Sequence, residues 1–174
     1  PTVVYGFVSA FLLVPLLRSC FQGSMGFSWL AASLTLTILI LPTIVLVIHA
    51  QLRQLGPWTQ LTAATLGMSQ TQALLWIVLP QGSRGLAAAA VLGFGRALGD
   101  TIISLMLAGN APQLPHSLLD SIRTLTAHIA LVVATDVHSA AYQSLFVAGL
   151  LLVIMSALLN ISIRWIIGRT GGVR

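Results

Sequence analysis

Four apolar segments of this chain are each long enough to cross the ~30 Å hydrocarbon core of a lipid bilayer as a helix. They are residues 1–17, 29–48, 85–109 and 142–163. Irregular backbone cannot face lipid, because its polar groups would have no hydrogen-bond partners there. We therefore expect an all-α fold, a polytopic transmembrane helix bundle that forms a single domain over residues 1–174.

The composition supports a membrane environment and argues against other classes. The chain is 57% hydrophobic and 6% charged, whereas a soluble domain carries about 25% charged residues. The formal net charge is +5, but the arginines form no patch of the kind that binds nucleic acid. Cys20 is the only cysteine, which excludes an internal disulfide and a cysteine zinc site. We expect membrane lipid as a partner, and no nucleic acid, metal or cofactor.

The arginines lie at the ends of the apolar segments, where they indicate the topology. If the connection 49–84 is cytoplasmic, five arginines lie on that side and two on the other. This distribution agrees with the positive-inside rule. The five are Arg53, Arg84, Arg164, Arg169 and Arg174, and the two are Arg18 and Arg123.

The exception is Arg96, which lies inside the apolar segment 85–109, with Asp100 four residues later. An arginine at the centre of a spanning helix costs about 2.5 kcal/mol or more, so it usually faces protein or a polar path. Residues four apart share a face of a continuous helix, so we expect Arg96 and Asp100 to touch. Either Arg96 binds an anion in transit while Asp100 competes for it, or the two form a structural ion pair.

Small residues surround this charge. Gly95 and Gly99 form a Gly-x-x-x-Gly pair, and a second ridge comprises Gly85, Ala89, Gly93 and Ala97. Such ridges let membrane helices approach closely. The contact lies either between subunits or within one subunit.

The connection between the second and third segments predicts two short helices. Gly56-Pro57 predicts a turn, and Gly67 is expected to close the helix that follows. Ser69 and Gln72 have the spacing of a capping box. A second helix should therefore begin there and stop near Pro80.

This connection resembles the EAA loop of bacterial ABC-importer permeases. The matching residues are Thr62, Ala63, Ala64, Gly67, Leu79 and Pro80. The departure is Thr62, where the family usually has Glu; a threonine can form a hydrogen bond at that point but not an ion pair. The resemblance implies that residues 55–80 are a cytoplasmic coupling-helix loop that docks on an ATPase subunit. The alternative is an interfacial helical hairpin without a partner.

Three further stretches narrow the resemblance to phosphate-uptake permeases. Residues 96–101, Arg-Ala-Leu-Gly-Asp-Thr, resemble the Arg-Ala-Leu-Gly-Glu-Thr signature, and residues 117–126 and 1–6 resemble two other family motifs. The resemblance implies the type I permease fold of an ABC importer, with a substrate path at Arg96, Asp100 and Thr101. That fold has six spanning helices and this sequence shows four, which implies that an N-terminal pair is missing.

The same resemblance implies a function and its partners. We expect a multi-pass subunit of the bacterial inner membrane that translocates inorganic phosphate and is not an enzyme. ABC ATPase subunits, a second permease subunit and an extracytoplasmic phosphate-binding protein would complete the importer. The chain has no phosphate-binding P-loop motif of its own. The alternatives are a permease for another oxyanion, molybdate or tungstate, and a non-transporting scaffold or channel-like subunit.

The outer connection, residues 110–141, holds most of the remaining polar side chains. Its apolar residues recur with helical spacing over 118–133, which predicts an outer-face or re-entrant helix. Asp120 and Arg123 are three residues apart, a spacing that allows an ion pair. His128 and His138 have no third ligand nearby in the sequence, so a metal site is not expected.

Overall fold

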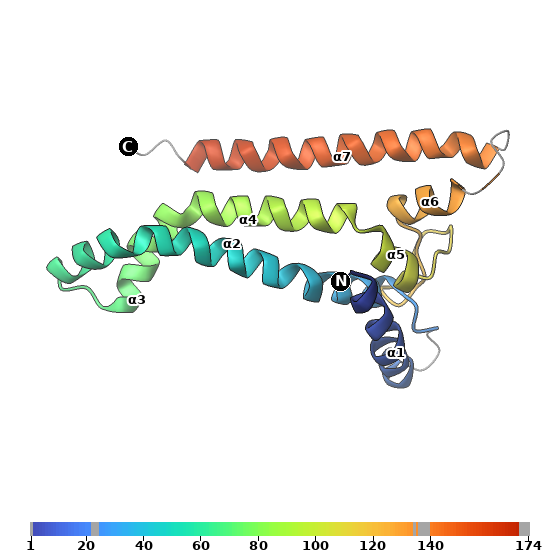
Figure 1. Cartoon of the computed structure of the whole chain (residues 1–174), viewed down its shortest axis with the longest axis horizontal. Coiled ribbons are helices and arrows are strands. Elements are labelled where there is room, and N and C mark those ends of the chain that lie inside the picture. The colour runs from blue at the N-terminus through green and yellow to red at the C-terminus, as the bar shows by residue number, and fades with distance from the viewer. Residues whose placement is uncertain (1, 22–24, 134, 136–139, 171–174) are drawn as a thin grey trace. The chain divides into compact units, whose positions relative to one another are not determined.

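The computed structural model describes residues 2–21, 25–133, 135 and 140–170. All named elements of this part of the chain are helices, as Figure 1 shows, so the all-α prediction is confirmed. In chain order they are α1 (Thr2–Cys20), α2 (Trp29–Thr65), α3 (Gln70–Ala73), the π-helix η1 (Leu74–Val78), α4 (Leu79–Gly99), α5 (Thr101–Leu107), α6 (Leu125–Val132) and α7 (Ala140–Thr170).

Three of these helices are long and apolar enough to cross a membrane, namely Thr2–Cys20, Trp29–Arg53 and Ala141–Trp165. They correspond to the first, second and fourth predicted segments. A fourth span is possible only if the bent helix pair Gln70–Ser83 and Gly85–Gly99 is taken as one span. The prediction of a continuous helix over 85–109 is wrong, because α4 ends at Gly99 and α5 begins at Thr101.

Two helix boundaries predicted from proline are also wrong. Helix α2 continues through Gly56-Pro57 to Thr65, and η1 passes directly into α4 across Pro80. A proline removes one backbone hydrogen bond from a helix, and here both helices continue in spite of that loss. The turn before Pro80 is a π-helix, in which the Leu79 amide donates to the carbonyl of Leu74.

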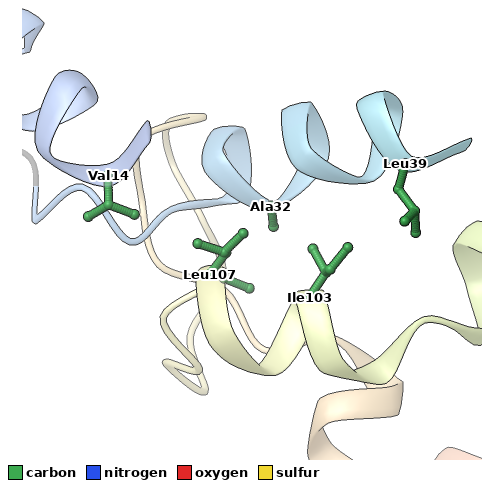
Figure 2. Close-up of a cluster of buried hydrophobic side chains, with 6 residues drawn as sticks. Val14, Ala32, Leu39, Ile103 and Leu107 are labelled. Carbon is green, nitrogen blue, oxygen red and sulfur yellow. The ribbon is translucent and has the colours of Figure 1, made fainter. Parts of the chain in front are cut away.

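The chain forms two compact units. Unit 1 comprises Pro1–Ile40 and Arg96–Ser156, and unit 2 comprises Leu41–Gly95 and Ala157–Arg174. The buried core of unit 1 joins α1, the start of α2, and α5. Figure 2 labels several of its side chains, namely Val14, Ala32, Leu39, Ile103 and Leu107. Ile103 and Leu107 are fully buried, so α5 is the helix around which unit 1 packs.

In unit 2, α4 approaches α2 closely at Gly85. A Cβ added to Gly85 would lie 2.7 Å from Cβ of Gln51, and Ala89 one turn later is fully buried. The second small-residue ridge therefore packs within the chain at these positions. By contrast, a Cβ added to Gly95 or Gly99 would meet no atom within 4 Å.

Candidate functional site

The first candidate site is the break between α4 and α5, which Asp100 creates. Asp100 has extended backbone angles, φ −81° and ψ 103°, and its Oδ1 accepts a hydrogen bond from the Ile103 amide. The donor–acceptor distance is 2.9 Å. Asp100 is 9% exposed, and its carbonyl accepts a bond from Ser104 Oγ at 3.0 Å. Asp100 is thus the N-cap of α5 and not an interior residue of α4.

Arg96 lies in the last turn of α4 and is exposed. Among the described residues it has no ion-pair partner, so the predicted contact with Asp100 is wrong. The i, i+4 rule holds only inside a continuous helix, and Asp100 has left the helical conformation to bond the Ile103 amide. A cation near a helix C-terminus is still favourable, because it meets the negative end of the helix dipole.

Thr101 is the first residue of α5 and is half-buried. Within the described part of the chain its hydroxyl makes no hydrogen bond. The break therefore combines a guanidinium, a capping carboxylate and an unbonded hydroxyl within six residues of sequence. The guanidinium and the hydroxyl are hydrogen-bond donors of the kind that bind anions.

The C-terminal end of α5 is built by two left-handed residues. Gly109 has φ +84° and Asn110 has φ +60°. A Cβ on Gly109 would overlap Ser121 Oγ and lie 3.1 Å from the carbonyl oxygen of Phe27, so glycine is needed there. Asn110 Nδ2 donates to the carbonyl of Leu105 at 2.7 Å, which satisfies one of the last carbonyls of the helix.

The outer connection differs from its prediction. The helix expected over 118–133 is confined to α6, Leu125–Val132. Thr124 caps it, since Thr124 Oγ1 accepts a bond from the Ala127 amide at 3.2 Å. The apolar spacing continued upstream of Thr124, but the cap and the backbone contacts of residues 117–123 stop the helix there.

The ion pair that the spacing of Asp120 and Arg123 allows is not formed. Asp120 Oδ2 accepts bonds from the amides of His116 at 2.7 Å and Ser117 at 2.8 Å. Arg123 Nε instead donates to the carbonyl of Asn110 at 2.9 Å. Asp side chains readily accept hydrogen bonds from nearby backbone amides, which explains why Asp120 bonds to His116 and Ser117 and not to Arg123.

The same loop caps the N-terminus of α2. The amides of Trp29 and Leu30 donate to the carbonyls of Asp120 at 3.0 Å and Leu118 at 2.9 Å. Ser28 Oγ accepts from the Ala31 amide at 3.2 Å. The contacts of Trp29 and Leu30 could not be predicted from the sequence, because partners about ninety residues away leave no local signal.

The histidines form no metal site in the described residues, where no group of three His, Cys, Asp or Glu side chains could hold an ion. His128 Nε2 lies 2.9 Å from Ser144 Oγ and links α6 to α7. His138 and Asp136 lie outside the described residues.

The second candidate site is the coupling-loop segment, residues 55–80, which runs from the end of α2 through α3 and η1 to the start of α4. Gly67 has φ +67°, and the Met68 amide donates to the carbonyl of Ala63 at 3.0 Å, so Gly67 ends α2 as predicted. The capping box is confirmed. The Gln72 amide donates to Ser69 Oγ at 3.4 Å and the Ser69 amide donates to Gln72 Oε1 at 3.0 Å.

Several large apolar side chains of residues 55–80 are exposed. Leu61, Leu66, Leu75 and Trp76 are 57% to 75% exposed. Of the residues that resemble the EAA loop, Thr62, Leu79 and Pro80 are exposed and Ala63 is buried, while the side chain of Ala64 lies outside the described residues. A Cβ on Gly67 would meet nothing within 4 Å.

Comparison with known proteins identifies the family. Residues 1–171 match the family described as "Binding-protein-dependent transport system inner membrane component". The chain belongs to this permease family. The family description names an inner-membrane component of a transport system, and the three long apolar helices agree with a multi-pass membrane protein.

Three relatives show the range of the family. "Probable ABC transporter permease protein YqgH" of Bacillus subtilis is 33% identical over 97% of this chain and 55% of the relative. "Phosphate transport system permease protein PstC 1" of Mycobacterium tuberculosis is 30% identical over 83% of this chain and 44% of the relative. "Molybdenum transport system permease protein ModB" of Haemophilus influenzae is 33% identical over 71% of this chain and 58% of the relative.

The chain spans about half the length of the curated relatives it matches. No solved structure matches it.

Proposed function

We propose that this permease translocates inorganic phosphate across the bacterial inner membrane as a subunit of an ATP-driven importer. The observation that carries the proposal is Arg96, an exposed guanidinium at the end of an apolar helix, without an ion-pair partner among the described residues. Relatives named as phosphate permeases from several bacteria support the choice of substrate.

The chemistry of the break suits a tetrahedral oxyanion. A guanidinium presents a planar fork of N–H donors that matches two phosphate oxygens. The unbonded hydroxyl of Thr101 offers one more donor. The carboxylate of Asp100, held in place by the Ile103 amide, would repel the anion and speed its release, which a transport path requires.

In this proposal the loop over residues 55–80 couples the permease to ATP hydrolysis. Its exposed leucines and Trp76 form an apolar surface that suits a groove on an ATPase subunit. Thr62 in place of the usual Glu makes that contact depend on apolar packing more than on an ion pair. The partners are two ATPase subunits, a second permease subunit and an extracytoplasmic phosphate-binding protein.

Uptake by the reconstituted importer tests the proposal. The whole importer, with this permease, is placed in proteoliposomes, and ATP-dependent uptake of radiolabelled phosphate is measured for wild type and Arg96→Gln. Loss of the charge-assisted hydrogen bonds should lower uptake at least about tenfold. Arg18→Gln is the matched control, since Arg18 is also exposed in the last turn of a spanning helix. Full uptake by an assembled Arg96→Gln importer would contradict the proposal.

A second candidate is another oxyanion, because a molybdenum permease is among the relatives. Molybdate is a tetrahedral dianion, as the doubly charged form of phosphate is, so Arg96 would bind it by the same contacts. ATPase stimulation by phosphate or by molybdate, each delivered by its own binding protein, distinguishes the two. A non-transporting scaffold predicts that no ATPase subunit is captured in a pull-down.

A further inference from the structure

The backbone at the C-terminal end of α5 holds Arg123 in a defined place. The amide of Ile122 donates to the carbonyl of Ala108 at 2.8 Å, and the amide of Asn110 donates to the carbonyl of Ile122 at 3.0 Å. These bonds place Arg123 beside Asn110, and Arg123 Nε donates to the Asn110 carbonyl at 2.9 Å. One edge of the guanidinium is thus fixed by a neutral backbone acceptor.

Among the described residues, no acidic side chain pairs with the rest of that guanidinium. Arg123 is half-buried, and within the described residues it forms no ion pair and no other hydrogen bond. The acid three residues before it, Asp120, is bound to the amides of His116 and Ser117. A guanidinium has five N–H donors, so most of them remain available to a ligand.

Arg123 and Arg96 lie on either side of the short helix α5 in the chain. Arg96 precedes its N-cap, Asp100, and Arg123 is bonded to Asn110 just beyond its C-cap. Seven helical residues rise about 10 Å, and the whole segment belongs to unit 1. The two carboxylates of this segment, Asp100 and Asp120, both accept bonds from backbone amides.

We propose that Arg123 is a second oxyanion contact, which receives a tetrahedral anion at the outer end of α5 before that anion reaches Arg96. The inference rests on the proposed function. A half-buried guanidinium with its Nε already bound keeps its terminal N–H groups aligned for two anion oxygens. Partial burial strengthens the attraction, because the local dielectric is below that of water.

Transport kinetics of the reconstituted importer test this role. The variants are Arg123→Gln, which keeps an N–H donor for the Asn110 carbonyl but loses the charge, and Arg123→Lys, which keeps the charge. At saturating phosphate-loaded binding protein, Arg123→Gln should lower the phosphate uptake rate about tenfold with the KM for the binding protein unchanged. Arg123→Lys should recover part of the rate, and Arg18→Gln should match wild type.

Other outcomes overturn the inference. A raised KM for the binding protein with an unchanged maximal rate would mean that Arg123 pairs with a carboxylate of that protein. A wild-type rate in Arg123→Gln would mean that the residue contacts no substrate. If the wild-type importer itself moves no phosphate, the proposed function is wrong. If the wild type transports phosphate and Arg123→Gln transports it equally fast, only the role of Arg123 is wrong.

A labelling measurement on the wild-type importer avoids any effect of substitution on folding. Phenylglyoxal modifies accessible guanidinium groups, and mass spectrometry reports the extent at each arginine. Inorganic phosphate should slow modification of Arg123 and leave Arg18 unaffected. Equal rates at Arg123 with and without phosphate would overturn the proposal.

Discussion

Removal of the Asp100 side chain separates the structural role of this residue from its proposed role in transport. Asp100→Ala deletes the acceptor for the Ile103 amide, a bond of 2.9 Å in a buried setting. Loss of an N-cap costs about 1 kcal/mol, within a range of about 0.5–2. Because the stranded amide is buried, we expect about 1–2 kcal/mol, a factor of roughly 5–30 in the folded-to-unfolded ratio. Asp100→Asn keeps an acceptor of nearly equal capping strength, so it should lose less than about 0.5 kcal/mol.

The assay is denaturant unfolding of the importer in detergent micelles, followed for both variants, together with phosphate uptake by the same preparations. Asp100→Asn should unfold like wild type but transport more slowly, because a neutral side chain no longer repels the anion and release is delayed. Equal destabilisation by Asp100→Asn and Asp100→Ala would refute the capping argument. Wild-type transport by Asp100→Asn would refute the role of the charge.

Two glycine comparisons test the packing of α4 and the end of α2. Gly85→Ala should destabilise the permease by about 1–3 kcal/mol through overpacking, since its Cβ would lie 2.7 Å from Cβ of Gln51. The added Cβ of Gly95→Ala meets no atom within 4 Å, so this variant should leave stability in detergent unchanged or raise it by up to about 1 kcal/mol. A Gly95→Ala permease less stable than the Gly85→Ala permease would contradict the described packing. Gly67→Ala should cost about 1–2 kcal/mol because of its left-handed backbone. It should also weaken capture of the ATPase subunit in a pull-down, and full capture with unchanged stability would count against the coupling loop.

Helix ends were predicted correctly where the hydrogen bonds that form them join residues close in the sequence. The capping box of Ser69 and Gln72 and the helix end at Gly67 are both present. Each depends on atoms within five residues along the chain, so residue type and spacing suffice to predict it. The apolar lengths of three membrane-spanning helices were predicted for the same reason.

The break at Asp100 was missed although the sequence carries a signal for it. Gly99 followed by Asp100 combines a common helix terminator with a common N-cap residue. The prediction followed the apolar character of residues 85–109 and not that signal, because a segment of this length can span a bilayer as one continuous helix. The expected contact between Arg96 and Asp100 depended on that continuity and failed with it.

By itself the sequence determined that this protein is an α-helical membrane permease, because apolar length and the order of its motifs are properties of the chain alone. Only the tertiary structure decided which distant groups bond to one another. The carbonyl of Asn110 accepts a bond from Arg123, thirteen residues later, and the carbonyl of Asp120 accepts one from the amide of Trp29. Many polar groups could form such a bond with similar energy, so the sequence alone does not specify the partner. The fold specifies it by placing one of these groups within hydrogen-bond distance.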